Sequence, residues 1–146
     1  MHLAPGSVPV APVATHLLPI VGNFAGRRGV YMKLGINDLA LTTEQREAVL
    51  EAKNQLMKQF SVEMIVVFGS VARGEDDEHS DLDLLVITGK VMTHGERNSV
   101  SDVIFEVNYA FGTNLSVVVV DALAWDSGIY SLGPFHSEVQ RDGVVV

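Results

Sequence analysis

The 146-residue sequence contains no cysteine, which excludes disulfide bonds and cysteine-based zinc sites. Basic residues are also scarce: 10 Lys and Arg stand against 18 Asp and Glu, for a formal net charge of −8. Proteins that hold nucleic acid draw much of their affinity from cationic side chains that neutralise phosphates. A nucleic-acid partner is therefore not expected. The absence of cysteine fits a reducing compartment, and we expect a cytoplasmic protein.

Long apolar runs are missing as well. No stretch approaches the roughly 20 apolar residues that a membrane-spanning helix needs. The N-terminus lacks the basic start and uninterrupted apolar segment of a signal peptide. The sequence therefore predicts neither a membrane span nor a signal peptide, and its hydrophobic content of 47% is sufficient for one domain with a buried core.

Proline is rare outside the N-terminus, because four of the five prolines fall within residues 1–30. This stretch shows no sustained hydrophobic period. We predict that residues 1–37 form a Pro/Gly-rich arm that is either poorly ordered or packed on a partner. The folded domain is predicted over residues 38–146.

The remaining residues alternate between helical and strand patterns. Apolar residues recur at helical spacing in two long segments, each opening with capping-box spacing, at Thr42 with Gln45 and at Thr93 with Glu96. Gly112 is expected to end the second helix. The predicted order is helix 41–60, strand 62–68 ending in a glycine turn, strand 80–88, helix 93–111, strand 114–121, helix 131–142 with Gly143 just past its end, and a short edge strand 144–146. This order predicts a small α/β (α+β) sandwich in which helices pack on a mixed sheet.

Two acids interrupt the strand predicted over 80–88. Alternation places Asp81 and Asp83 on one face, with Cβ atoms about 6–7 Å apart. Burying carboxylates is costly unless a cation neutralises them. Oxygen ligands favour hard cations such as Mg²⁺ or Mn²⁺, and two such ions can hold the attacking and leaving oxygens of a phosphoryl displacement. The pair therefore indicates a metal site.

A glycine turn precedes this pair. Gly69 and Ser70 lie between a strand and a short predicted helical turn over 70–74. Glycine lets a phosphate approach the backbone, the free N–H groups at a helix start favour an anion, and the Ser70 hydroxyl adds a donor. Arg73 either adds positive charge nearby or caps the turn. An anion cradle followed by a carboxylate pair favours a site for a metal–triphosphate complex.

The segment GSVARGEDDEHSDLDLLV, residues 69–86, resembles the signature of the polymerase-beta-like nucleotidyltransferase superfamily, especially its minimal, stand-alone members. That signature is Gly-Ser, often followed by Ala-Arg-Gly, then a variable loop, Ser-Asp-x-Asp and an apolar strand. The resemblance extends over roughly residues 40–146. The matching residues are Gly69, Ser70, Ala72, Arg73, Gly74, Ser80, Asp81 and Asp83.

The resemblance implies a nucleotidyltransferase fold and transfer of a nucleoside monophosphate from an Mg²⁺- or Mn²⁺-bound NTP, with ATP expected, to a hydroxyl. Pyrophosphate would be released. Asp81 and Asp83 would hold the metal ions, and Gly69 and Ser70 the triphosphate. Arg73 and Ser80 would belong to the same nucleotide site, with less defined roles.

One family feature is missing from the matching strand. Active members usually add a third carboxylate from the strand after the second helix, but here Asn114, Ser116 and Val118 share the relevant face. Asp121 has the opposite parity and is expected to cap a turn or helix. Asn114 or Ser116 is thus predicted in the third position. Two explanations remain open: an enzyme that works without this acid, or a weak or inactive nucleotide-binding module that acts through a protein partner.

The resemblance also suggests a partner. Small members of the superfamily resemble the antitoxin half of a two-protein module, in which a helical HEPN protein is neutralised when its tyrosine is nucleotidylated. This implies a HEPN-type partner and an acceptor that is a protein side chain or a small molecule. The acidic loop over residues 75–78 counts against a nucleic-acid acceptor, because its charges repel phosphates.

Overall fold

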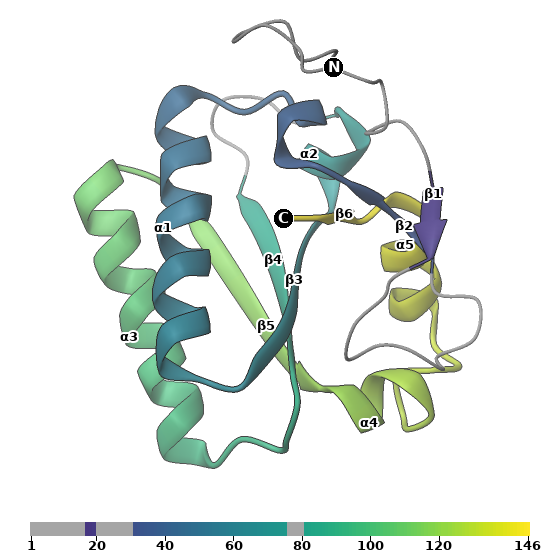
Figure 1. Ribbon diagram of the computed structural model, residues 1–146. Coiled ribbons are helices and arrows are strands. Elements are labelled where there is room, and N and C mark those ends of the chain that lie inside the picture. The colour runs from purple at the N-terminus through teal and green to yellow at the C-terminus, as the bar shows by residue number, and fades with distance from the viewer. Residues whose placement is uncertain (1–16, 20–30, 76–80) are drawn as a thin grey trace, which may run out of the picture.

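The computed structural model describes residues 17–19, 31–75 and 81–146, and in them a single mixed sheet with helices on both faces (Figure 1). The strand order is β1-β2-β6-β3-β4-β5. The strands are β1 (Leu17–Pro19), β2 (Tyr31–Leu34), β3 (Val62–Phe68), β4 (Leu82–Thr88), β5 (Leu115–Asp121) and β6 (Val144–Val145). The helices are the 3₁₀ helix η3 (Ile36–Asp38), α1 (Thr43–Gln59), α2 (Ser70–Arg73), α3 (His94–Phe111), α4 (Ala122–Asp126) and α5 (Pro134–Asp142). The predicted α/β class is confirmed.

Both predicted capping boxes are present. The Thr42 hydroxyl accepts a hydrogen bond from the Gln45 N–H at 3.0 Å, and the Thr42 N–H donates to Gln45 Oε1 at 2.9 Å. The Thr93 and Glu96 pair does the same at the start of α3, with both distances 3.1 Å. Gly112, at a φ of 66°, ends α3 in the left-handed conformation. These local signals therefore set the boundaries of the two long helices.

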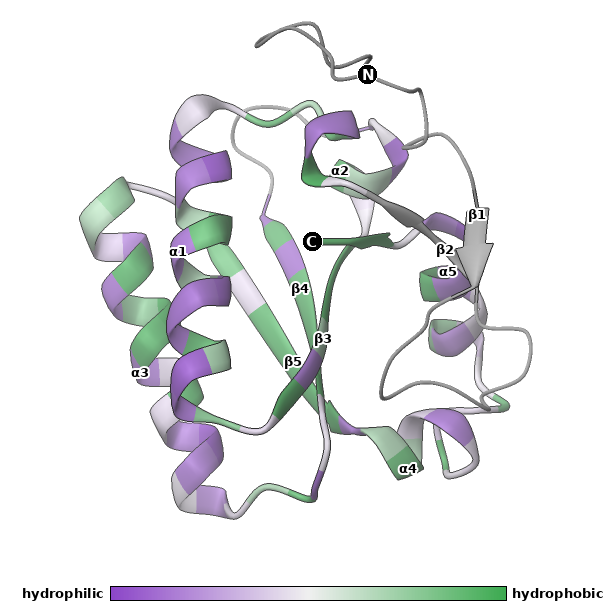
Figure 2. Cartoon of the chain, in the orientation of Figure 1, coloured by the Kyte–Doolittle hydropathy of each residue, from purple (hydrophilic) through white to green (hydrophobic). Residues whose placement is uncertain are grey.

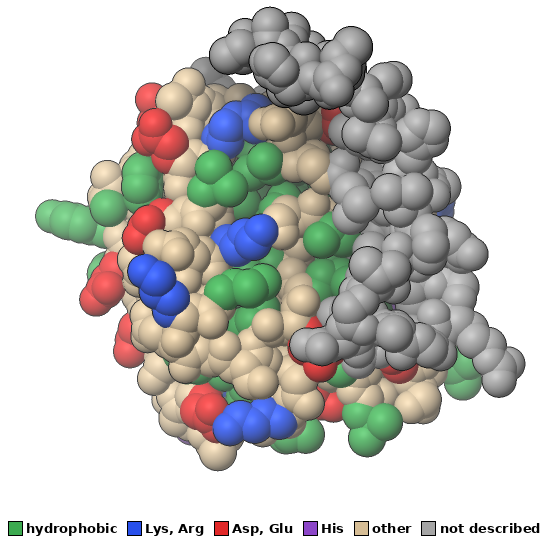
Figure 3. Space-filling model, viewed as in Figure 1, with side chains coloured by type: hydrophobic (Ala, Val, Ile, Leu, Met, Phe, Trp, Pro, Cys, Tyr) green, Lys and Arg blue, Asp and Glu red, His purple; other side chains and the backbone are tan. Residues whose placement is uncertain are grey.

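The sheet separates two apolar layers. Leu82, Leu84 and Val86 of β4 pack in the larger layer beneath α1 and α3, whereas Leu85 and Ile87 pack in the smaller layer beneath α4 and α5. Figure 2 shows the central strands as largely hydrophobic, while α1 and α3 alternate in character along their length. On the face viewed in Figure 3, Lys and Arg side chains lie among acidic ones and do not gather in one patch. None of the described helices is long and apolar enough to cross a membrane.

The short strand β6 departs from its predicted place. It is not an edge strand, because it pairs antiparallel with β3 on one side and parallel with β2 on the other. The second partner comes from the predicted arm: β2 pairs with β6, and β1 pairs antiparallel with β2. The sheet thus includes strands on both sides of the predicted domain boundary at residue 38. The other residues of the arm up to residue 30 lie outside the described residues.

An aromatic cluster fills the layer between the sheet and the two C-terminal helices. Trp125 is 1% exposed, and its ring centroid lies 4.4 Å from that of His136. Phe135 meets Trp125 edge-on at 5.9 Å and Phe68 at 5.2 Å. The Trp125 indole N–H has no hydrogen-bond partner in the described part of the chain. Trp125 is therefore a core residue.

We expect His136 to make the folded protein less stable in mild acid. Burial lowers the pKa of His136 from its ordinary value of 6.5, although the nearby Asp126 opposes this shift. Between the lowered pKa and 6.5 the unfolded chain binds more protons, so the free energy of unfolding should rise with pH in that window. Chemical denaturation of the wild type and His136→Gln from about pH 5 to pH 7 tests this. Parallel pH profiles for the two proteins would contradict it.

Candidate active site

The site is built where β4 begins, between the end of β3 and the start of β5. Asp81 immediately precedes β4, and Asp83 is its second residue. The register places Asp83 beside Phe68 of the antiparallel β3 and beside Ser116 of the parallel β5. Leu82 and Leu84 point into the α1 and α3 layer, so alternation directs Asp83 to the opposite face.

Each carboxylate meets one of the two residues predicted for the third position. The Ser116 hydroxyl donates to Asp83 Oδ1 at 2.7 Å, and the Asn114 side-chain amide donates to Asp81 Oδ1. Asp81, Asn114 and Ser116 are exposed and Asp83 is half-buried. This end of the strand is therefore accessible to water, which explains how two carboxylates are accommodated beside a buried strand.

The turn at Gly69 lies directly against the second carboxylate. Gly69 has a φ of 82°, and a Cβ atom built on it would lie 2.5 Å from Asp83 Oδ2. A residue with a side chain would have to displace that carboxylate. Ser70 follows as the first residue of the predicted helical turn, which the structure forms as α2. Gly69 and Asp83, about a dozen residues apart in sequence, thus lie in direct contact, and Ser70 follows that contact in the chain.

Arg73 does not cap the turn. The N–H of Gly74 caps it instead, by donating to the carbonyls of Ser70 and Val71. The Arg73 side chain pairs with Glu75 at 3.1 Å and is 37% exposed. Arg73 therefore keeps its positive charge beside the turn, partly neutralised by the first acid of the loop.

A small cavity of about 100 Å³ adjoins Gly69 and Arg73. Its remaining walls come from β3 and α5, and they include two acids: the lining residues are Phe68, Glu138, Val139 and Asp142. Sequence reasoning missed the contribution of α5, because no local motif connects a C-terminal helix with a turn so far upstream. Charges of both signs lie around this cavity, because Arg73 is among its lining residues and Asp142 pairs with Arg141 at 2.9 Å.

Two further residues named from the sequence are Ser80 and Asp121. Ser80 lies outside the described residues, as does the neighbouring His79. Asp121 caps α4, since its Oδ2 accepts a hydrogen bond from the Ala124 N–H at 2.9 Å. This confirms the expected cap.

The donor set fits a hard cation. Two carboxylates, a hydroxyl and an amide oxygen are ligands of the kind that Mg²⁺ prefers. No group of three His, Cys, Asp or Glu side chains suited to a metal occurs among the described residues. Asp81 and Asp83 stay the predicted metal ligands, with Ser116 and Asn114 as neutral neighbours.

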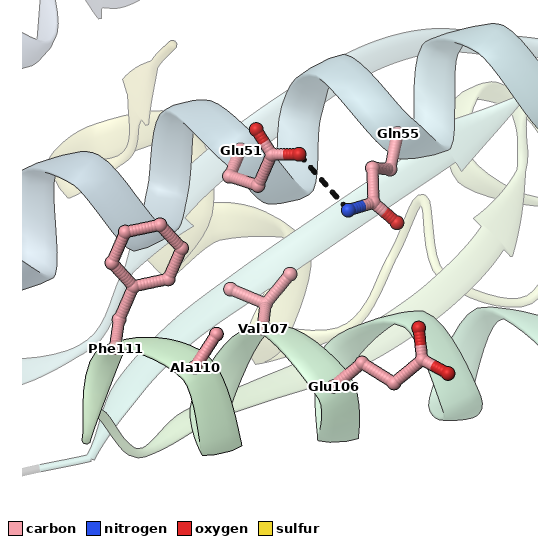
Figure 4. A pocket seen from close by; sticks show the side chains of 6 residues that line it. All are labelled: Glu51, Gln55, Glu106, Val107, Ala110 and Phe111. Atoms are coloured by element: carbon pink, nitrogen blue, oxygen red, sulfur yellow. Dashed lines mark hydrogen bonds between the residues drawn. The ribbon is translucent and has the colours of Figure 1, made fainter.

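A second hollow lies on the other side of the sheet. It has a volume of about 390 Å³ and runs between α1 and α3 (Figure 4). Within it Gln55 donates to Glu51 at 2.9 Å. Its lining residues are Glu51, Gln55, Glu106, Val107, Ala110 and Phe111. Because Asp83 faces away from these helices, this groove is separate from the candidate active site.

Comparison with known proteins adds named relatives. The protein adenylyltransferase MntA of Thermococcus cleftensis is 51% identical over 47 residues, which cover 32% of this chain and 48% of the relative. The chain spans about half the length of the curated relatives it matches. Among solved structures, a provisionally assigned minimal nucleotidyltransferase is 28% identical over 71% of this chain and 95% of the other, with a TM-score of 0.48. A toxin–antitoxin structure with AMP-PNP is 15% identical over 70% of each chain, with a TM-score of 0.45.

The family model described as polymerase beta, nucleotidyltransferase matches residues 51–126, just over half of the chain. This range contains the Gly69 turn, both aspartates and the strand that carries Ser116. It agrees with the resemblance carried by the Gly-Ser and Asp-x-Asp motifs. The chain therefore belongs to the polymerase beta nucleotidyltransferase family.

Proposed function

We propose that the protein transfers a nucleoside monophosphate from an Mg²⁺-bound NTP, with ATP as the preferred donor, to a hydroxyl group on a protein, and releases pyrophosphate. Family membership supports nucleotidyl transfer in general. Relatives named as protein adenylyltransferases support ATP as donor and protein as acceptor. Mn²⁺ is expected to replace Mg²⁺, because both are hard cations that take oxygen ligands.

The close approach of Gly69 to Asp83 carries this proposal. A phosphate held at the Gly69 turn would lie next to the carboxylate pair. The turn is so close to Asp83 that a Cβ atom on Gly69 would lie 2.5 Å from Asp83 Oδ2. The backbone N–H groups after Gly69 and the Ser70 hydroxyl supply donors to phosphate oxygens. Asp81 and Asp83 supply the negative charge that would hold Mg²⁺. Bound Mg²⁺ would supply positive charge to the phosphate oxygens and the leaving pyrophosphate.

The acceptor hydroxyl must lose a proton during transfer, and Ser116, which stands where a third carboxylate is expected, is not suited to accept it. The Ser116 hydroxyl already donates its own proton to Asp83 and is not a base at neutral pH. We infer that the acceptor proton leaves to water or to a group of the substrate. An acceptor that ionises readily, such as a phenol, is then favoured over an aliphatic alcohol.

The partner that fits this acceptor is a HEPN-type helical protein. The resemblance to antitoxin-type minimal nucleotidyltransferases suggests such a protein, with a tyrosine as the modified residue. The chain itself has an acidic net charge of −8, which favours a protein acceptor over a nucleic acid.

A nucleotide-binding module without transfer is the second candidate function. Ser116 in place of a carboxylate beside Asp83 favours it, since a third acid is the usual base of active members. Such a module would bind Mg²⁺-ATP at the same residues and act through contact with its partner.

One labelling experiment separates the two. The purified protein is incubated with Mg²⁺ or Mn²⁺ and each α-³²P-labelled NTP in turn, with and without lysate of its own host. We expect ATP to label a protein, and we expect labelling to require both aspartates. Metal-dependent ATP binding with no label on any protein or small molecule would favour the module instead.

A further inference from the structure

Asn108, in the last turn of α3, makes three side-chain hydrogen bonds to the connection that follows. Its Nδ2 donates to the Leu115 carbonyl at 3.0 Å, and its Oδ1 accepts from the Leu115 N–H at 2.8 Å and from the Thr113 hydroxyl at 3.0 Å. Its backbone carbonyl accepts from the N–H groups of Gly112 and Thr113. Asn108 therefore holds the connection between α3 and β5 through hydrogen bonds from both its side chain and its backbone.

Leu115 is the residue between Asn114 and Ser116. The Asn114 carbonyl accepts the Leu82 N–H at 3.0 Å, so alternation turns the peptide groups of Leu115 away from β4 toward the free edge of the sheet. The Asn108 carboxamide bonds both of these groups, as a further strand would. Without these bonds, the backbone groups at the start of β5 would have hydrogen-bond partners on β4 only, because β5 is an edge strand.

We propose that Asn108 is a positioning residue for the candidate active site: its carboxamide fixes the start of β5 so that Asn114 and Ser116 lie beside Asp81 and Asp83. The inference rests on the proposed function, because the two aspartates are taken to hold the metal. Asn108 touches neither aspartate and acts only through the strand. Partners that orient groups around a metal commonly change metal affinity by about 10–100-fold when they are replaced.

Arg97 offers a matched control. It also lies on α3 and also bonds β5 from the free edge, since its Nη1 donates to the Val119 carbonyl at 3.0 Å. Val119 lies three residues beyond Ser116, toward the far end of the strand. Arg97→Ala therefore removes a hydrogen bond from α3 to the same strand, but leaves the hydrogen bonds at the start of β5 in place.

The test compares Asn108→Ala, Asn108→Asp and Arg97→Ala in the full chain. Thermal unfolding reports stability, and titration at several Mg²⁺ concentrations reports ATP affinity. We expect Asn108→Ala to weaken Mg²⁺-dependent ATP affinity about 10-fold or more. Arg97→Ala should leave that affinity within about twofold of the wild type, because the lost bond holds the far end of the strand. Asn108→Asp keeps the two acceptor bonds but replaces the donor to the Leu115 carbonyl by a carboxylate oxygen that repels it, so this variant should also bind ATP more weakly than the wild type.

A second readout needs no nucleotide. The side-chain amide resonances of Asn114, observed by NMR, should shift in Asn108→Ala and Asn108→Asp and stay in place in Arg97→Ala. Equal ATP affinity in the Asn108 and Arg97 variants, or unmoved Asn114 resonances, would overturn the inference. If the wild type binds no Mg²⁺-ATP, the proposed function fails while the NMR comparison still decides the role of Asn108. Should Asn108→Ala not fold, Asn108→Asp carries both measurements.

Discussion

Replacing Asp81 and Asp83 together by Asn is expected to weaken Mg²⁺-dependent ATP binding at least about 100-fold, because even outer partners of a metal site change affinity about 10–100-fold. Both negative charges of the candidate metal site disappear in this variant. The amide that replaces Asp83 can still accept the Ser116 hydrogen bond, so the local contacts survive while the charge does not. Nucleotide transfer should fall to background along with binding.

The same variant should fold as well as the wild type. Two like charges near one another repel in the absence of metal, so their removal costs little or slightly stabilises the protein. Titration of ATP with and without Mg²⁺, together with Tm, measures both effects. A control variant, Asp102→Asn with Glu106→Gln, removes two charges from α3 on the other side of the sheet and should bind ATP normally. Unchanged ATP affinity in the Asp81 and Asp83 variant would exclude the metal-site assignment.

Gly69→Ala is expected to reduce Mg²⁺-dependent ATP affinity about 10-fold or more, on the same scale of metal-site perturbation. The added Cβ atom would lie 2.5 Å from Asp83 Oδ2, so the carboxylate must leave its position. The backbone contributes as well, because a φ of 82° with a ψ of −157° is a conformation that residues other than glycine adopt at a cost of about 1–3 kcal/mol. The variant should therefore lose stability in addition to affinity.

Gly74→Ala separates these two effects. Gly74 also has a positive φ, 72°, but a Cβ atom there would meet nothing within 4 Å. Its substitution should cost about 1–2 kcal/mol of stability through the backbone alone and leave ATP affinity near that of the wild type. Denaturant unfolding and ATP titration of both variants make the comparison. If both variants lost the same affinity, backbone strain and not the displacement of Asp83 would be the cause.

Local chemistry explains the parts of the fold that sequence reasoning predicted. Thr42 and Thr93 satisfy N–H groups at their own helix starts, and Gly112 supplies its own positive φ, so neighbouring residues suffice to specify these boundaries. The same holds for the short turn after Gly69. Strand alternation likewise sent Asp83 to the face opposite Leu82 and Leu84.

The tertiary structure alone decided where β6 lies. The short run at Val144 and Val145 was predicted as an edge strand, yet β2, which lies far earlier in the sequence, pairs beside it. A strand becomes internal only when another segment supplies hydrogen bonds on its free side, and that segment is distant in sequence.

For the candidate active site, the sequence by itself determined the two aspartates, the glycine turn and the absence of a third acid in the facing strand. Only the tertiary structure paired Ser116 with Asp83 and Asn114 with Asp81, and only it brought Gly69 within contact of the Asp83 carboxylate. These contacts depend on the register of β5 against β4 and on the turn after β3. Register is fixed by packing and hydrogen bonds across the whole sheet, which no local motif contains.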